Sequence, residues 1–194
     1  VIVAVADASS LKRNLLFCTQ IIDLKRPVVV ALTMTDIARK KGIQIDINEM
    51  ERELGVPVVA VNPRKNKGID ALKKAIELVS GNLYKPTPRN FIDVSSLAPE
   101  AIRRVQQILP GVGEYEAVHY LINHETFALN NDVQEQIEQT EKDYQFNPTR
   151  TQAEEILQRY TRINHILNVA VTFPDPQKQS RMTERLDNIF LHPF

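Results

Sequence analysis

The chain contains very little cysteine: Cys18 is the single one among 194 residues. A disulfide framework and a cysteine-rich metal site are therefore excluded, and we expect Cys18 to pack in a core. Charge of one sign is not in excess, because 24 basic side chains balance 24 acidic ones. No general attraction to nucleic acid or anionic lipid is expected. No apolar run has the length of a membrane span, and no secretory signal pattern is seen.

The ends of the sequence lack the usual signals of a complete chain. Val1 is not an initiator methionine, and the apolar run Val1–Ala6 begins at once. The last residues, 191–194, carry no closing signal either. We therefore expect a fragment of a longer protein, with enough residues for one large domain or two small ones.

Residues 1–81 alternate short apolar runs with helical patterns. The expected strands are Val1–Ala6, Val28–Leu32 and Val56–Val61, and the expected helices are Leu11–Leu24, Asp46–Gly55 and Ile69–Val79. This order predicts an α/β fold with a parallel sheet covered by helices on both faces. Ligands of such sheets bind at the loops that follow the strands. Those loops are Asp7–Ser9, Thr33–Asp36 and Asn62–Lys67.

Beyond residue 81 the pattern changes to an all-α one. A proline-rich stretch, 82–98, reads as a linker. Every later segment has helical periodicity: Pro99–Leu109, Glu114–His124, Val133–Tyr144, Pro148–Phe173 and Arg181–Leu191. We therefore predict an α/β domain at 1–81, a linker at 82–98 and a helical domain at 99–194.

Two of the three loops match the way P-loop GTPases recognise guanine. One of their loops ends a strand in Asn-Lys-x-Asp, whose carboxylate accepts hydrogen bonds from the ring N–H and the exocyclic amine. The next strand ends in Ser-Ala-x, where a backbone N–H donates to the guanine carbonyl. In this chain the corresponding loops are Thr33-Met34-Thr35-Asp36 and Asn62-Pro63-Arg64.

The surrounding sequence makes the resemblance specific. DASSLKRNL at residues 7–15 is similar to the Asp-Ala-x-x-Leu-x-Arg-Asn-Leu stretch of the ferrous iron transporter family FeoB. PVVVALTMTD at residues 27–36 resembles that family's Pro-Val-Val-Val-Ala-Leu-Asn-Met-x-Asp. Arg159-Tyr160, TERLD at 183–187 and His192-Pro193 resemble the segment before its first membrane helix. The match is weakest at about residues 82–145. It rests on the order and spacing of the motifs together, since no single motif decides it.

The resemblance implies the second part of a cytosolic GTPase domain, a partial P-loop sheet, followed by the helical domain described as slowing guanine nucleotide release. It implies guanine-binding roles for Thr33, Met34, Asp36, Asn62, Pro63 and Arg64. Implied ligands are GTP or GDP with Mg²⁺ in the intact protein, and Fe(II) is the transported substrate. The implied location is the cytoplasmic face of the bacterial inner membrane, with membrane segments after Phe194.

The chain departs from the family pattern at three points. Thr33 replaces Asn and lacks an amide, and Pro63 has no backbone N–H. We expect guanine binding that is weaker or less selective than is normal for the family. No Gly-x-x-x-x-Gly-Lys-[Ser/Thr] phosphate loop occurs in the 194 residues. We therefore expect no catalytic residues here, no GTP hydrolysis by this chain alone and no tight nucleotide binding. An open sheet edge adds self-association to the expected partners.

Two other functions remain open. LPGVG at residues 109–113, before a helix, resembles the hairpin of helix-hairpin-helix DNA-binding proteins, and Arg103 and Arg104 precede it. Glu114 and Glu116 at the next helix start would repel phosphate, so a tight helix–helix turn is favoured and no nucleic-acid partner is expected. The second of these functions is that of a non-catalytic α/β interaction domain. His119 and His124 are five residues apart, which does not fit one helical face, and no metal site is predicted.

Overall fold

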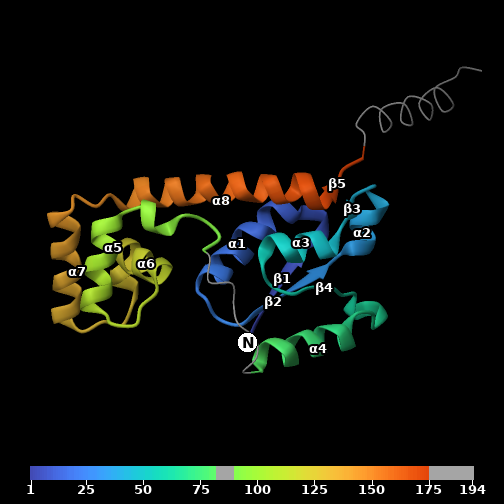
Figure 1. The fold of residues 1–194 in the computed structure, drawn as a ribbon, viewed down its shortest axis with the longest axis horizontal. Coiled ribbons are helices and arrows are strands. Elements are labelled where there is room, and N and C mark those ends of the chain that lie inside the picture. The colour runs from blue at the N-terminus through green and yellow to red at the C-terminus, as the bar shows by residue number, and fades with distance from the viewer. Residues whose placement is uncertain (82–89, 175–194) are drawn as a thin grey trace, which may run out of the picture.

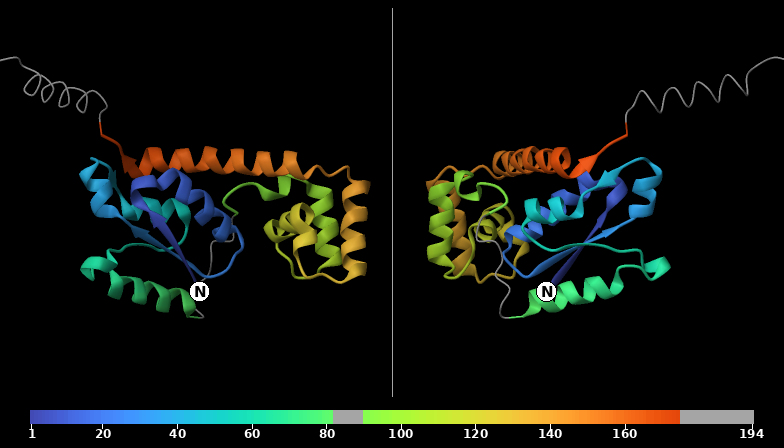
Figure 2. Two further views of the ribbon diagram at one scale, coloured as in Figure 1. Left: turned by 180° about the vertical axis from the view of Figure 1, so that it is seen from behind. Right: turned by 45° about the vertical axis from the view of Figure 1, so that its right-hand side comes forward.

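The computed structural model describes residues 1–81 and 90–174. Figure 1 shows a small sheet with its helices at one end of the molecule and a group of helices at the other. The long helix α8 (Pro148–Ala170) lies along both parts. The two views in Figure 2 show the same arrangement from behind and obliquely.

The sheet has three parallel strands in the order β1-β2-β4. These strands are β1 (Ile2–Asp7), β2 (Val28–Thr33) and β4 (Val58–Ala60). The central strand β2 is buried from Val28 to Leu32, as a strand covered on both faces should be. The predicted parallel sheet is confirmed, with β4 shorter than the apolar run Val56–Val61.

Helices cover the two faces of the sheet unequally. Helices α1 (Leu11–Asp23) and α3 (Ile47–Leu54) lie on one face, and α4 (Ile69–Ser80) lies on the other (Figure 1). On β1, Ala4 and Ala6 face α1 and are buried, whereas Val3 and Val5 are 36% and 60% exposed. Cys18 on α1 is fully buried in this core, which confirms the prediction for the thiol.

Two elements near the sheet differ from the prediction. Helix α2 (Thr35–Lys40) follows β2 directly and was not expected. The predicted helix Pro148–Phe173 is wrong at its end, because the β-branched pair Val171–Thr172 forms strand β5. Strand β5 pairs antiparallel with β3 (Gln44–Ile45), so the chain beyond residue 99 is not purely helical.

The helical part contains α5 (Pro99–Ile108), α6 (Glu114–Asn123) and α7 (Asn131–Asp143), and α8 is its fourth helix. Their shared core includes Ile102, Val105, Val118, Leu121 and Ile137. Helix α7 begins two residues before the predicted start, because the Asn130 side chain caps it by accepting a hydrogen bond from the Val133 amide. The four helices predicted within 99–174 are thus present.

Parts of the sequence interpretation fall outside the described residues. The predicted helix Arg181–Leu191 and residues 82–89 of the predicted linker 82–98 are among them. The domain division 1–81, 82–98 and 99–194 stays a prediction. What the structure does show is that α8 contacts α1, α3 and α6, so the helix packs on both parts of the chain.

Candidate functional site

The carboxyl ends of β2 and β4 lie side by side, and the loops that follow them enclose a cavity of about 460 Å³. All six residues predicted to bind guanine line this cavity. Ile37, Val61 and Lys65 complete its wall. The parallel register therefore brings two loops that are about 30 residues apart in the sequence into one site.

The first loop is shaped by an unusual backbone conformation at Met34. Its φ of 55° lies in the left-handed region, which is uncommon for a residue other than glycine. Met34 precedes α2 and turns the chain so that Asp36 falls in the first turn of that helix. The Thr33 hydroxyl donates to the Ala6 carbonyl at 3.1 Å. Thr33 therefore ties this loop to β1.

One oxygen of the Asp36 carboxylate accepts a hydrogen bond from the neighbouring backbone, and the other lies near the Lys65 ammonium group. Its Oδ1 accepts from the Ile37 amide at 3.1 Å, and its Oδ2 lies 4.0 Å from Lys65 Nζ. The Asp36 side chain is 42% exposed. A ligand entering the cavity can thus reach the carboxylate.

The second loop is a tight turn built on Asn62. The Asn62 side chain accepts from the Lys65 amide at 3.2 Å, and its backbone pairs with Lys67 in both directions. Pro63 occupies the first position of the short 3-10 helix Pro63–Lys65. Gly68 closes the turn at φ 79°, where a Cβ atom would lie 2.1 Å from the Ala60 carbonyl oxygen. Most backbone N–H groups of this loop therefore already donate hydrogen bonds within the loop.

The loop after β1, predicted as a third ligand loop, lies at a different cavity. Asp7 Oδ1 accepts from the Ser9 amide at 2.7 Å and caps the turn Ala8–Ser10. The cavity beside it has a volume of about 850 Å³, and α8 supplies part of its wall through Asn164, Leu167 and Asn168. The sequence did not predict this cavity, because no local pattern shows that α8 packs beside the loop that follows β1.

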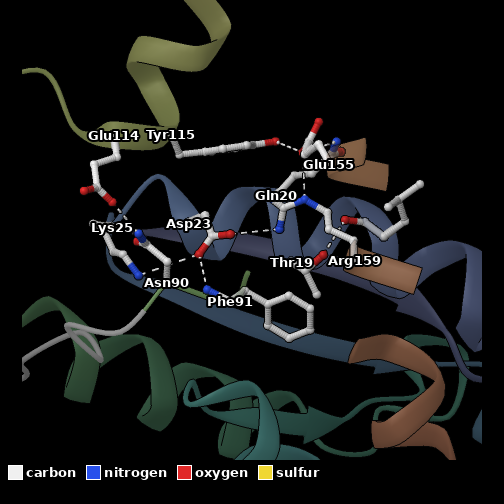
Figure 3. A network of polar contacts seen from close by, with 11 residues as sticks. Thr19, Gln20, Asp23, Lys25, Asn90, Phe91, Glu114, Tyr115, Glu155 and Arg159 are labelled. Carbon is white, nitrogen blue, oxygen red and sulfur yellow. Dashed lines mark hydrogen bonds and ion pairs between the residues drawn. The ribbon is translucent and has the colours of Figure 1, made fainter. Parts of the chain in front are cut away.

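A buried polar network joins the two parts of the chain (Figure 3). Arg159 on α8 is fully buried and contacts two carboxylates: Nη1 lies 2.9 Å from Asp23 on α1, and Nε lies 2.7 Å from Glu155. Tyr115 on α6 donates its hydroxyl to Glu155 at 2.8 Å, and its ring lies 4.6 Å from the guanidinium carbon. The Phe91 amide donates to Asp23 at 2.5 Å. Three segments far apart in sequence therefore meet at one arginine.

The network changes the acid–base properties of its members. Burial tends to raise the pKa of Glu155, but the hydrogen bonds from Arg159 and Tyr115 outweigh it, and the pKa lies below its ordinary value. Burial raises the pKa of the Tyr115 hydroxyl. Burial also lowers the pKa of His119, whose ring stacks edge-on against Tyr115 at 4.6 Å. Glu155 therefore stays ionised beside Arg159, and His119 favours its neutral form.

His124 makes a second polar contact that the sequence did not predict. Its Nδ1 lies 3.1 Å from Glu141 and its Nε2 lies 3.7 Å from Glu138, both on α7. The two carboxylates flank opposite ring nitrogens and so do not converge with one nitrogen on a common point. Within 1–81 and 90–174, no group of three His, Cys, Asp or Glu side chains is arranged to hold a metal ion.

The hairpin considered for DNA binding is closed by its own carboxylate. Gly111 takes φ 90° in the turn, and the Gly113 amide donates to the Glu116 carboxylate at 3.0 Å. Glu116 also pairs with Arg26 at 3.2 Å. The amide that would hold a DNA phosphate is thus already bonded to a negative group, which agrees with a structural turn.

Comparison with known proteins identifies the family of this chain. The profile described as ferrous iron transport protein B matches residues 1–76. The Fe(2+) transporter FeoB of Staphylococcus aureus (strain MSSA476) is 30% identical over the whole chain. The chain belongs to the FeoB family. It spans 30% of the length of that relative. The family resemblance read from residues 7–15 and 27–36 is confirmed.

Solved structures of FeoB cytosolic parts share the fold. A GDP form of the T. maritima cytosolic domain aligns with a TM-score of 0.69 at 19% identity, covering 89% of this chain and 68% of that one. The mGMPPNP-bound S. thermophilus NFeoB aligns with a TM-score of 0.63 at 26% identity, covering 88% and 67%. No comparison supports the DNA-binding alternative. None of the helices within 1–81 and 90–174 has the length and apolar character to cross a membrane.

Proposed function

We propose that this chain binds guanine nucleotide through the cavity at the ends of β2 and β4, as part of the nucleotide-responsive module of a ferrous iron uptake transporter. The observation that carries the proposal is Asp36, a half-exposed carboxylate that lines a base-sized cavity opposite the Asn62 turn. A carboxylate accepts from the ring N–H and the exocyclic amine of guanine together, which adenine cannot offer. FeoB relatives with bound GDP or mGMPPNP support this ligand class.

We propose a role for each of the six predicted residues that line the cavity. Asp36 selects the base, and Met34 with Pro63 supplies apolar wall. Asn62 holds the second loop in shape, and Thr33 holds the first loop to β1. Arg64 lies at the exposed rim of the cavity. Because Thr33 and Pro63 offer the base fewer donors than the usual Asn and Ala, we propose weak guanine binding in this chain.

The phosphates and Mg²⁺ would be held by residues that this sequence does not contain. A phosphate loop of the Gly-x-x-x-x-Gly-Lys-[Ser/Thr] type is absent from the 194 residues. Among the described residues no acidic or histidine cluster suits a metal ion. The residues present therefore do not fit Mg²⁺, and we propose that this chain alone binds the base without hydrolysing GTP.

In the longer protein, we place this part at the cytoplasmic face of the inner membrane. The chain covers 30% of its S. aureus relative, named an Fe(2+) transporter. Membrane segments after Phe194 would then carry Fe(II), and α8 would relay the nucleotide state toward them. Self-association through the open edge of β1 is part of the same proposal.

Asp36→Asn tests the base-binding role. The ¹⁵N-labelled chain is titrated with 5′-GMP and 5′-AMP, and amide shifts of residues 33–37 and 62–68 give the dissociation constants. Loss of a charge-assisted bond should weaken GMP binding by roughly tenfold or more. AMP should bind weakly to both forms.

Asp70→Asn is the matched control. Asp70 is the first-turn acid of α4, as Asp36 is of α2, but it is 93% exposed and does not line the cavity. The proposal is refuted if the unaltered chain shows no GMP-dependent shifts, or if both variants bind GMP equally well.

A further inference from the structure

The cavity that holds Asp36 also contains a positively charged side chain, which the sequence patterns did not predict as a site residue. Lys65 lines the cavity, and its Nζ lies 4.0 Å from Asp36 Oδ2. This distance is longer than a hydrogen bond, so the ammonium is near the carboxylate without being locked to it. The lysine backbone is held by the Asn62 turn through its own amide. Lys65 therefore presents a donor group from a fixed loop.

We propose that Lys65 reads the carbonyl oxygen of the base while Asp36 reads the neighbouring N–H groups; this rests on the guanine-binding function proposed above. Guanine places the acceptor O6 directly beside the donor N1–H. An ammonium beside a carboxylate is the complementary donor–acceptor pair. Adenine reverses the pattern, so its amino group would meet Lys65 and its ring nitrogen would meet Asp36. Lysine contacts to guanine O6 are common in recognition of this base.

The surrounding loops explain why a side chain is needed for this role. Pro63 has no N–H, and the amides of Asn62, Lys65, Asn66 and Lys67 all donate within the loop. The Thr33 hydroxyl already donates to the Ala6 carbonyl. A base carbonyl in the cavity therefore finds few backbone donors in the second loop. Lys65 supplies the donor that these groups do not.

Lys65→Met tests the proposal with two ligands that differ at one atom. The chain is titrated with 5′-GMP and with 5′-6-thio-GMP, in which sulfur, a weaker acceptor, replaces O6. In the unaltered chain GMP should bind roughly fivefold more tightly than the thio analogue. Lys65→Met should weaken GMP binding by roughly five- to tenfold and bring the two affinities close together. Lys65→Arg keeps a donor and should preserve the preference.

Lys67→Met is the matched control, since Lys67 lies in the same loop but does not line the cavity. The inference is overturned if Lys65→Met retains the preference for GMP over the thio analogue. Tighter GMP binding by that variant would also overturn it, because Lys65 would then compete for Asp36. If Asp36→Asn weakens GMP binding while Lys65→Met does not, only the proposed role of Lys65 is refuted. If the unaltered chain binds no GMP, both proposals fall.

Discussion

Replacing Arg159 by methionine should destabilise the protein far more than any replacement of an exposed arginine. The side chain is fully buried, and the Asp23 and Glu155 side chains beside it are 0% and 3% exposed. Methionine fills similar space but leaves Glu155 without its counter-ion and leaves Asp23 with only the more distant Lys25, whose Nζ lies 3.7 Å from Asp23 Oδ1. Removing one partner of a buried ion pair costs about 3–5 kcal/mol. That cost is a large fraction of the stability of a typical domain.

Arg162→Met provides the comparison in the same helix. Arg162 pairs with Glu53 at 2.9 Å, but its side chain is 31% exposed, so its loss should cost about 1 kcal/mol or less. Urea unfolding followed by circular dichroism gives both free energies, with the slopes compared to check two-state behaviour. Adding Asp23→Asn and Glu155→Gln to Arg159→Met should recover part of the loss, because the stranded charges are removed. Equal costs for Arg159→Met and Arg162→Met would refute the reasoning.

Two further predictions concern pH and backbone conformation. Because the Glu155 pKa is lower in the folded chain, its stabilising effect is present above the ordinary value of 4.5 and lost as the pH falls through the folded value. Glu155→Gln should therefore flatten the decline of the urea midpoint between about pH 5 and 3, and an unchanged decline would contradict this. Gly68→Ala should cost about 1–3 kcal/mol, since its Cβ would meet the Ala60 carbonyl. Gly111→Ala should cost less, because φ is also positive but no atom lies within 4 Å, and thermal unfolding of the two variants compares them.

The strongest local patterns were sufficient to predict the main elements. The apolar run Val28–Leu32 could be read as a buried central strand, because alternation is lost when both faces are covered. The helices beginning at Pro99 and Pro148 were predicted from helical periodicity, and proline suits the first helical position that it occupies in both. Proximity of the loops at Thr33 and Asn62 followed from the rule that parallel strands end at one edge.

Other features depend on partners that are distant in the sequence. Strands β3 and β5 have two residues each, and neither has a periodicity that a short window could detect. Their pairing exists because α8 returns the chain to the sheet. Likewise, Met34 enters the left-handed region only as part of the turn into α2, so neither the turn nor the helix was apparent from residue types.

The sequence by itself determined the family, the parallel sheet and six of the nine residues that line one cavity. It could do so because each of these follows from local pattern, strand direction and motif order. The tertiary structure alone decided that Arg159 is buried between Asp23 and Glu155, and that Lys65 stands beside Asp36. An arginine or lysine in a sequence is by default a surface residue. Only the packing of α8 on α1, and of one loop against another, determines which charges meet.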